Sequence, residues 1–201
     1  MRERSDGGSM SRSKIPFVLG LLILLGDVVP AQEETISMAV LSSHRHRIGA
    51  SDNPLVGLFV STDRGATWRH RGWKEYIRTF SSVRARDGAL WSACGNGVLR
   101  SLDGGETWRV TTGWDVTEVL KVNVNDADPR RVAAATAYGV VTTTDGGETW
   151  RTSSTGKNRR FCSDVTWVRG SASGLLAGTE KGIVRSTDGG ATWRPSGLRT
   201  S

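Results

Sequence analysis

The chain has 201 residues, among them 25 glycines, 8 tryptophans and 2 cysteines, and it carries a formal net charge of +7. This composition is typical of many short strands joined by tight turns, and it argues against a fold built from long helices. The positive balance favours anionic partners. However, one arginine directly follows each Trp of a repeated motif, which indicates a solvated strand face, so we expect no nucleic-acid partner. These arginines are Arg69, Arg109, Arg151 and Arg194.

Residues 1–31 are predicted to be a secretory signal peptide. An apolar run from Ile15 to Gly26 follows two basic residues and precedes small residues suited to cleavage after Ala31. The run of about twelve residues is shorter than the roughly 20 that span a bilayer. We therefore expect export to a secreted, periplasmic or other extracytoplasmic location, with no membrane span after cleavage. A buried N-terminal helix is the alternative. Met10 is a second candidate start, in which case residues 1–9 are not translated.

Residues 32–201 contain four copies of one eight-residue pattern, and no Pro- or Ser-rich linker divides them. From Asp to Asp, the copies lie 40, 42 and 43 residues apart. A near-constant period of this length is the signature of a repeat architecture, and each unit has room for four short antiparallel strands, the size of one propeller blade. The copies begin at Ser61, Ser101, Thr143 and Ser186.

The first unit has three predicted strands, at residues 36–41, 57–60 and 67–71, and lacks an innermost strand. Each later unit begins with an alternating strand, followed by a small-residue strand, a third strand that opens with glycine, and a fourth that starts at Thr-Trp-Arg of the motif. The alternating strands are predicted at residues 76–84, 116–124 and 161–168. Fifteen strands leave open blade edges, so we expect either a fragment of a larger ancestral propeller or a ring completed by self-association.

The repeated motif is predicted to lock a hairpin rather than to form an active site. Its Asp can accept hydrogen bonds from backbone N–H groups one and two residues on, and its opening Ser or Thr can tie a hydroxyl into the same turn. The second glycine supplies the positive φ of a tight hairpin, and the Trp seals the seam to a neighbouring strand or blade. The structural set is Asp63, Gly65, Trp68, Asp103, Gly105, Trp108, Asp145, Gly147, Trp150, Asp188, Gly190 and Trp193.

The Ser/Thr-x-Asp-x-Gly-x-Thr-Trp pattern of the four copies resembles the Asp box, or BNR repeat. The chain is therefore similar to sialidase-like and related Asp-box β-propellers, a group that includes sialidases, xyloglucan-cleaving hydrolases, sortilin-type receptors and photosystem II assembly factors. The resemblance covers nearly all of residues 35–197 and implies an all-β propeller, complete or partial, of four repeats. It also implies that the boxes lie on the face away from the ligand site.

The catalytic residues of sialidases do not carry over. No Phe/Tyr-Arg-Ile-Pro tetrapeptide occurs, and Glu75 and Tyr76 are adjacent on a predicted strand, so they point to opposite faces and make a poor nucleophile pair. Acidic residues for two-carboxylate hydrolysis are present by composition only. They are Asp87, Asp126, Asp128 and Asp164. We predict no catalytic residue and no cofactor; a sialidase-like glycoside hydrolase, or a degenerate or truncated descendant of one, is the alternative.

The face opposite the boxes is the predicted binding face, because it collects the loops from fourth to first strands and from second to third strands. Exposed Trp beside cationic donors is a usual composition for binding sugars, anionic glycans or acidic protein segments. In the alternative interpretation, both Trp side chains cap blade seams and the charges only confer solubility. The predicted ligand is a glycan or a protein, and an anionic one suits the charge. The candidate residues are Trp73, Lys74, Trp114, Lys157, Arg159 and Arg160.

Cysteine and histidine give little further chemistry. Export would permit a disulfide, but the repeat places Cys94 and Cys162 on different kinds of strand, which favours two buried thiols over a pair. His44, His46 and His70 have no partner ligand at a defined spacing, so no metal site is predicted.

Overall fold

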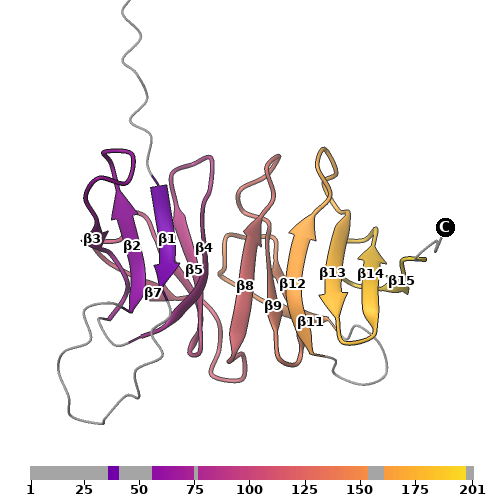
Figure 1. Cartoon of the computed structure of the whole chain (residues 1–201). Coiled ribbons are helices and arrows are strands. Elements are labelled where there is room, and N and C mark those ends of the chain that lie inside the picture. The colour runs from indigo at the N-terminus through magenta and orange to yellow at the C-terminus, as the bar shows by residue number, and fades with distance from the viewer. Residues whose placement is uncertain (1–35, 41–55, 75–76, 154–160, 198–201) are drawn as a thin grey trace, which may run out of the picture. The chain divides into compact units, whose positions relative to one another are not determined.

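The computed structural model describes residues 36–40, 56–74, 77–153 and 161–197, and these ranges contain fifteen β-strands and no helix. Antiparallel pairing arranges the strands in four sheets, each built from consecutive strands (Figure 1). Nothing in these ranges is a helix long and apolar enough to cross a bilayer. The fold is the all-β arrangement of propeller blades that the repeats predict.

The strands have the following bounds. The first sheet contains β1 (Ile36–Val40), β2 (Gly57–Ser61) and β3 (Arg69–His70). The second contains β4 (Thr79–Arg84), β5 (Leu90–Cys94), β6 (Gly97–Ser101) and β7 (Arg109–Val110). The third contains β8 (Val119–Val124), β9 (Val132–Thr136), β10 (Gly139–Thr143) and β11 (Arg151–Ser153). The fourth contains β12 (Cys162–Trp167), β13 (Leu175–Thr179), β14 (Gly182–Ser186) and β15 (Arg194–Pro195).

Neighbouring sheets pack through their inner strands: β4 contacts β8, and β8 contacts β12. Between the second and third sheets the core contains Trp91, Val98 and Val122, and between the third and fourth it contains Val140, Val165 and Leu175. The central strand β9 is buried along its whole length, because its small side chains allow both adjacent sheets to approach. The interior is therefore a set of seams between blades.

The outer strands are shorter than predicted. Each begins at the arginine after the motif Trp, whereas the sequence pattern predicted a start at the Thr two positions earlier. The reason is local: the Thr uses its N–H and its hydroxyl to bind the box Asp, as Thr107 does with Asp103 at 2.9 Å and 2.6 Å. These groups are therefore committed to the turn and do not join the ladder.

The Asp boxes close hairpins between third and fourth strands, but the reach of the Asp differs from the prediction. Asp145 accepts the N–H of Glu148 and of Thr149, both at 3.0 Å, so its donors lie three and four residues on rather than one and two. The opening Thr143 binds as predicted: its hydroxyl donates to Asp145 at 2.7 Å and accepts the N–H of Gly147 at 3.0 Å. Gly147 has a φ of +87°, as a tight turn requires.

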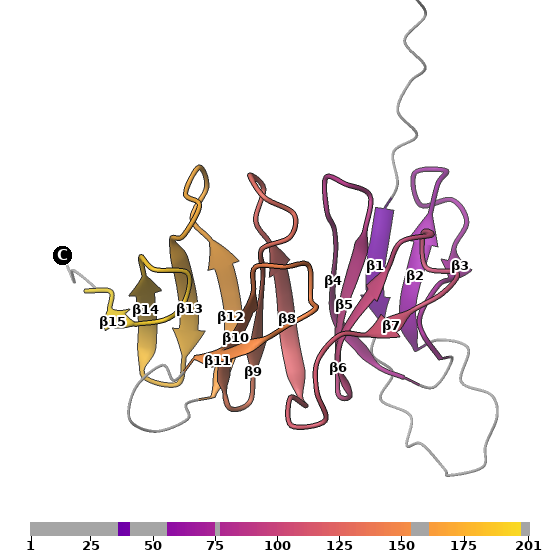
Figure 2. The same ribbon diagram turned by 180° about the vertical axis from the view of Figure 1, so that it is seen from behind.

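In the described part of the chain the sheets do not close into a ring. The first sheet contains three strands, with β1 at its inner edge, and the first and last sheets do not pack on one another (Figures 1 and 2). Met38 in β1 is half exposed. The inner edge of β1 thus presents unpaired backbone beside an apolar side chain.

Candidate functional site

The face opposite the Asp boxes carries three exposed aromatic side chains in the segments that connect its strands. Trp114 lies in the segment between β7 and β8, Tyr138 in the turn between β9 and β10, and Phe161 directly before β12. Their exposed fractions are 93%, 46% and 44%. Since antiparallel strands alternate in direction, all three segments lie at the end of the sheets away from the boxes (Figure 1). We call these three residues the aromatic row.

Backbone hydrogen bonds join the segments that bear the aromatic row. The N–H of Ala137, next to Tyr138, donates to the carbonyl of Glu118 at 3.2 Å, and the N–H of Glu118 donates to Gly95 of the second sheet at 3.0 Å. The carbonyl of Phe161 accepts the N–H of Glu180 at 3.3 Å. The segments of Trp114 and Tyr138 are therefore connected to each other, and that of Phe161 is held to its own sheet, which suits a binding surface supported by a rigid scaffold.

Glu118 has an unusual backbone for its residue type. Its φ is +52°, and Arg64 is the other described non-glycine residue with a positive φ. Such a conformation costs a non-glycine residue roughly 1–3 kcal/mol, and strained positions of this kind gather at functional sites. The Glu118 side chain is exposed, and it lies between two sheets on the same face as the aromatic row.

Each inner strand of the later sheets begins with a β-bulge at this face. The register shifts between Thr79 and Ser81, between Val119 and Lys121, and between Cys162 and Asp164. A bulge re-aims a side chain, and bulges are over-represented beside active sites. The bulged residues are Phe80, Leu120 and Ser163, of which Phe80 and Ser163 are exposed. Two blades, the second and the fourth, thus expose the bulged side chain at the same end of the sheets as the aromatic row.

The predicted binding residues have the following positions in the structure. Trp73 is half-buried, whereas Lys74 and Trp114 are exposed. Lys157, Arg159 and Arg160 lie outside the described residues. Tyr138 and Phe161 were not predicted as binding residues. The sequence could have indicated both residues, because an aromatic residue in a turn, or directly before an inner strand, stands where the fold does not need a buried side chain.

Neither cysteine pairs, which confirms the prediction of two buried thiols. The thiol of Cys94 donates to the carbonyl of Gly97 at 3.4 Å, and that of Cys162 to the carbonyl of Asp164 at 3.2 Å. Burial raises the pKa of Cys94 above its usual value and raises the pKa of Cys162 to about 11. Both groups are therefore neutral thiols with little nucleophilic character.

His70 has a structural environment. Its Nε2 lies 3.1 Å from the carbonyl of Val56, and its ring meets Phe59 edge-on at 5.2 Å. His44 and His46 lie outside the described residues. In the described ranges, no three His, Cys, Asp or Glu side chains gather as metal ligands do.

The box carboxylates are hydrogen-bond acceptors held in their ionised form. The hydroxyl of Thr67 lowers the pKa of Asp63 to about 2, and the hydroxyl of Thr192 lowers that of Asp188 to about 2. A carboxylate with such a pKa is a poor general acid or base at neutral pH, because it takes up a proton only in strong acid. The electrostatics therefore agree with a structural role for the boxes.

Most acidic candidates for glycoside hydrolysis are turn residues on the box side. Asp87 accepts the N–H of Ala89 at 3.1 Å, and Asp128 accepts the N–H of Arg130 at 3.1 Å. Asp126 lies in the turn between β8 and β9. Asp164, at the bulge of β12, lies at the other end of its sheet, with Oδ1 accepting the N–H of Val165 at 2.8 Å. The face with the aromatic row thus carries Glu118 and Asp164 beside the inner strands, as well as Asp115 and Glu180 in its loops.

Residues 59–70, which contain the first box, match the family model described as BNR/Asp-box repeat. No curated protein sequence matches the chain. Among solved structures, an ancestral GH74 enzyme is similar with a TM-score of 0.63 at 19% identity, covering 74% of this chain and 22% of that one. YCF48 bound to D1 peptide gives 0.54 at 19% identity, with 73% and 50% covered. The extracellular domain of a one-component system from B. thetaiotaomicron gives 0.53 at 16% identity, with 72% and 20% covered.

The chain carries BNR/Asp-box repeats folded as a β-propeller. At these identities the likeness shows the fold alone, and the chain spans between about a fifth and a half of the length of these structures. These Asp-box propellers include an enzyme, a protein bound to a peptide and an extracellular domain. Since one fold serves such different purposes, the function has to be argued from the site.

Proposed function

We propose that this Asp-box propeller is an exported, non-enzymatic binding or scaffold protein that recognises a glycan or protein ligand on the face opposite its boxes. The observation that carries the proposal is the aromatic row. Three aromatic side chains from separate connecting segments are exposed on one face. Because they are exposed, they add little to the folding stability of a monomer without a ligand. Large apolar groups gathered at one surface mark an interaction site.

The charges on this face complete the proposed site. Lys74 beside Trp73 and Lys121 beside the bulge of β8 are cations, and Glu118 and Asp164 are anions. Within the described residues, the side chains of Lys74, Lys121 and Glu118 make no hydrogen bond or ion pair. An aromatic surface supplies stacking area for a sugar ring or a side chain, and charged groups without a partner in the protein can orient a ligand by hydrogen bonds or ion pairs.

The proposal is tested with the full-length product on a glycan array and a displayed peptide library. Trp114→Ala is expected to weaken binding of the selected ligand by about 30-fold, as removal of an aromatic anchor does. Leu102→Ala is the matched control, because Leu102 is 72% exposed but lies in the second box, on the other face. Equal losses for the two variants contradict the proposed face.

A glycoside hydrolase is the competing function, since Glu118 and Asp164 supply two carboxylates on the binding face. A panel of aryl glycosides separates the two cases. Turnover that disappears in both Glu118→Gln and Asp164→Asn establishes an enzyme and overturns the non-enzymatic proposal. Binding without turnover supports it.

Export and self-association belong to the same proposal. Residues 1–31 lie outside the described residues, and export is tested by the N-terminal sequence of the exported protein, expected to begin at Gln32. Self-association is supported by the unpaired inner edge of β1 with the half-exposed Met38, because an open strand edge pairs readily with another strand. Light scattering that shows a compact monomer at all concentrations contradicts it.

A further inference from the structure

The seams between sheets contain a repeated ion pair. In the second and third boxes, the residue three positions after the Asp is a glutamate, and each glutamate binds an arginine from the outer strand region of the preceding sheet. Glu106 pairs with Arg71, and Glu148 pairs with Arg109. The second pair is bidentate, since Arg109 Nη2 lies 2.6 Å from Glu148 Oε1 and Nη1 lies 3.2 Å from Oε2.

Large side chains fill the rest of the seam between the second and third sheets. Trp91 of β5 is 1% exposed and meets Trp150 edge-on, with ring centroids 6.5 Å apart. The guanidinium of Arg100 lies over the Trp91 ring at 5.2 Å, and its Nη1 donates to the carbonyl of Gly146 in the third box at 3.1 Å. This seam is thus closed by an aromatic pair, a stacked arginine and an ion pair.

The seam between the third and fourth sheets has a small residue at each equivalent position. Counting along matching strands, Ala133 of β9 replaces Trp91, and Thr142 of β10 replaces Arg100. In the fourth box, Ala191 replaces the glutamate three positions after the Asp. Arg151 is retained at the place of Arg109, directly after the box Trp. The last seam therefore has the arginine of the preceding seam, but neither its glutamate nor its large side chains.

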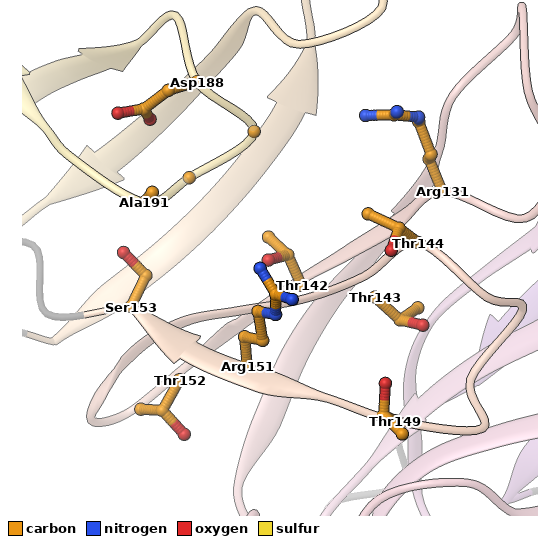
Figure 3. Close-up of a pocket in the computed structure, with 12 residues that line it drawn as sticks. Arg131, Thr142, Thr143, Thr144, Thr149, Arg151, Thr152, Ser153, Asp188 and Ala191 are labelled. Carbon is orange, nitrogen blue, oxygen red and sulfur yellow. The ribbon is translucent and has the colours of Figure 1, made fainter.

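A pocket of about 330 Å³ lies at this position, lined by Arg151, Thr142 and Ala191 among others. In Figure 3 the guanidinium of Arg151 points inward, towards Thr142 and the loop of the fourth box. Within the described residues, the side chain of Arg151 makes no hydrogen bond or ion pair. The space beside two of these small residues, Thr142 and Ala191, and the cation left by one missing glutamate thus coincide.

The other charged groups of the pocket are already engaged. Asp188 accepts the hydroxyl of Ser186 at 2.7 Å and the N–H of Thr192 at 2.9 Å, and its carboxylate is turned away from Arg151 (Figure 3). Arg131 binds Asp128 at 3.5 Å and the carbonyl of Ala172 at 3.2 Å. The free polar groups are then the Arg151 guanidinium and hydroxyls such as that of Thr142, which suits an anion with two oxygen atoms.

We propose that this pocket binds the carboxylate of an acidic side chain from a partner peptide, in the place that the box glutamate occupies in the other two seams. The seam between the second and third sheets shows the geometry: a glutamate held by two parallel N–H···O contacts from one guanidinium. A partner peptide supplies in trans what the fourth box lacks. The site is separate from the aromatic row, because it lies on the box side of the sheets.

The test measures fluorescence anisotropy of a labelled peptide of alternating Gly and Glu against the full-length product, with the corresponding Gly–Gln peptide as reference. The wild-type protein is expected to bind the Glu peptide and not the Gln peptide. Arg151→Gln is expected to weaken binding by about 10- to 100-fold, the effect of a charge-assisted bidentate contact. Ala191→Glu is expected to weaken it similarly, because the introduced glutamate occupies the pocket and pairs with Arg151.

Arg194→Gln is the matched control, since Arg194 has the same place after its box Trp and its loss changes the net charge equally. It is expected to leave binding unchanged within about twofold. Equal losses in Arg151→Gln and Arg194→Gln assign the affinity to general charge attraction and overturn the site. Binding of the Gln peptide, or binding of free glutarate as tightly as the Glu peptide, overturns the assignment to an acidic peptide.

Discussion

Trp91 is the side chain on which closure of the seam between the second and third sheets depends. It is 1% exposed, contacts Trp150, and supports the guanidinium of Arg100 at 5.2 Å. Trp91→Ala would give this seam the small residue that Ala133 supplies at the equivalent position of the next one, and Trp150 and Arg100 would lose the ring that they contact. The expected loss of unfolding free energy is about 4 kcal/mol, since truncation of a buried Trp costs about 3–5 kcal/mol.

The measurement is urea unfolding followed by far-UV circular dichroism, which follows the loss of the strands and does not need the fluorescence of the tryptophan being replaced. With a slope of about 2 kcal/mol per M, the midpoint is expected to fall by about 2 M. Trp114→Ala removes the same atoms from a side chain that is 93% exposed, and its effect is expected to stay within about 0.5 kcal/mol. If both variants shift the midpoint equally, burial in the seam is not what stabilises the fold.

Three further predictions concern the boxes and the thiols. Because Asp63 and Asp188 have pKa values lowered from 3.8 to about 2, their contribution to stability is complete above about pH 4 and is lost as the pH falls towards 2, which an acid titration by circular dichroism measures. Ser101→Ala leaves the buried N–H of Gly105 without its 2.8 Å acceptor and should cost about 1–3 kcal/mol in urea unfolding. Since burial raises the pKa of Cys94 and Cys162, neither thiol should react with a disulfide reagent at pH 8 until the protein unfolds.

Each of these predictions has a result that contradicts it. Loss of structure complete at or above pH 4 would show that the box carboxylates are not the groups that titrate. A Ser101→Ala variant as stable as the exposed-site variant Leu102→Ala would show that the hydroxyl does not serve the turn. Reaction of both thiols at the rate of a small free thiol in the folded protein contradicts their burial.

The positions of the strands were predictable because their signals are local. Alternation of apolar and polar residues marks β8, and a glycine opens β6, β10 and β14. The reach of the box Asp was predicted wrongly, since it depends on the path of a loop with two left-handed glycines rather than on the spacing of a simple turn. Asp145 therefore finds its donors three and four residues on.

The end of the sheets opposite the boxes was predictable, because antiparallel order alone determines which loops share it. Which aromatic side chains are exposed there was predicted only in part. Trp73 is half-buried, and Tyr138 and Phe161 are exposed beside Trp114. Whether an aromatic residue near a strand end packs into a seam or faces solvent depends on the adjoining sheet, and a single repeat does not contain that neighbour.

The sequence by itself determined the four-unit repeat and the hairpin role of the boxes, because a 40- to 43-residue period and the chemistry of Asp, Gly and Thr act within one unit. Only the tertiary structure decided what lies between units. Ala133, Thr142 and Ala191 are spread over the chain, and packing of the third sheet on the fourth brings Thr142 and Ala191 to one pocket beside Arg151. A seam combines residues from two units. Whether it is filled by side chains or contains a pocket therefore depends on how the two sheets pack, and neither copy of the repeat determines this alone.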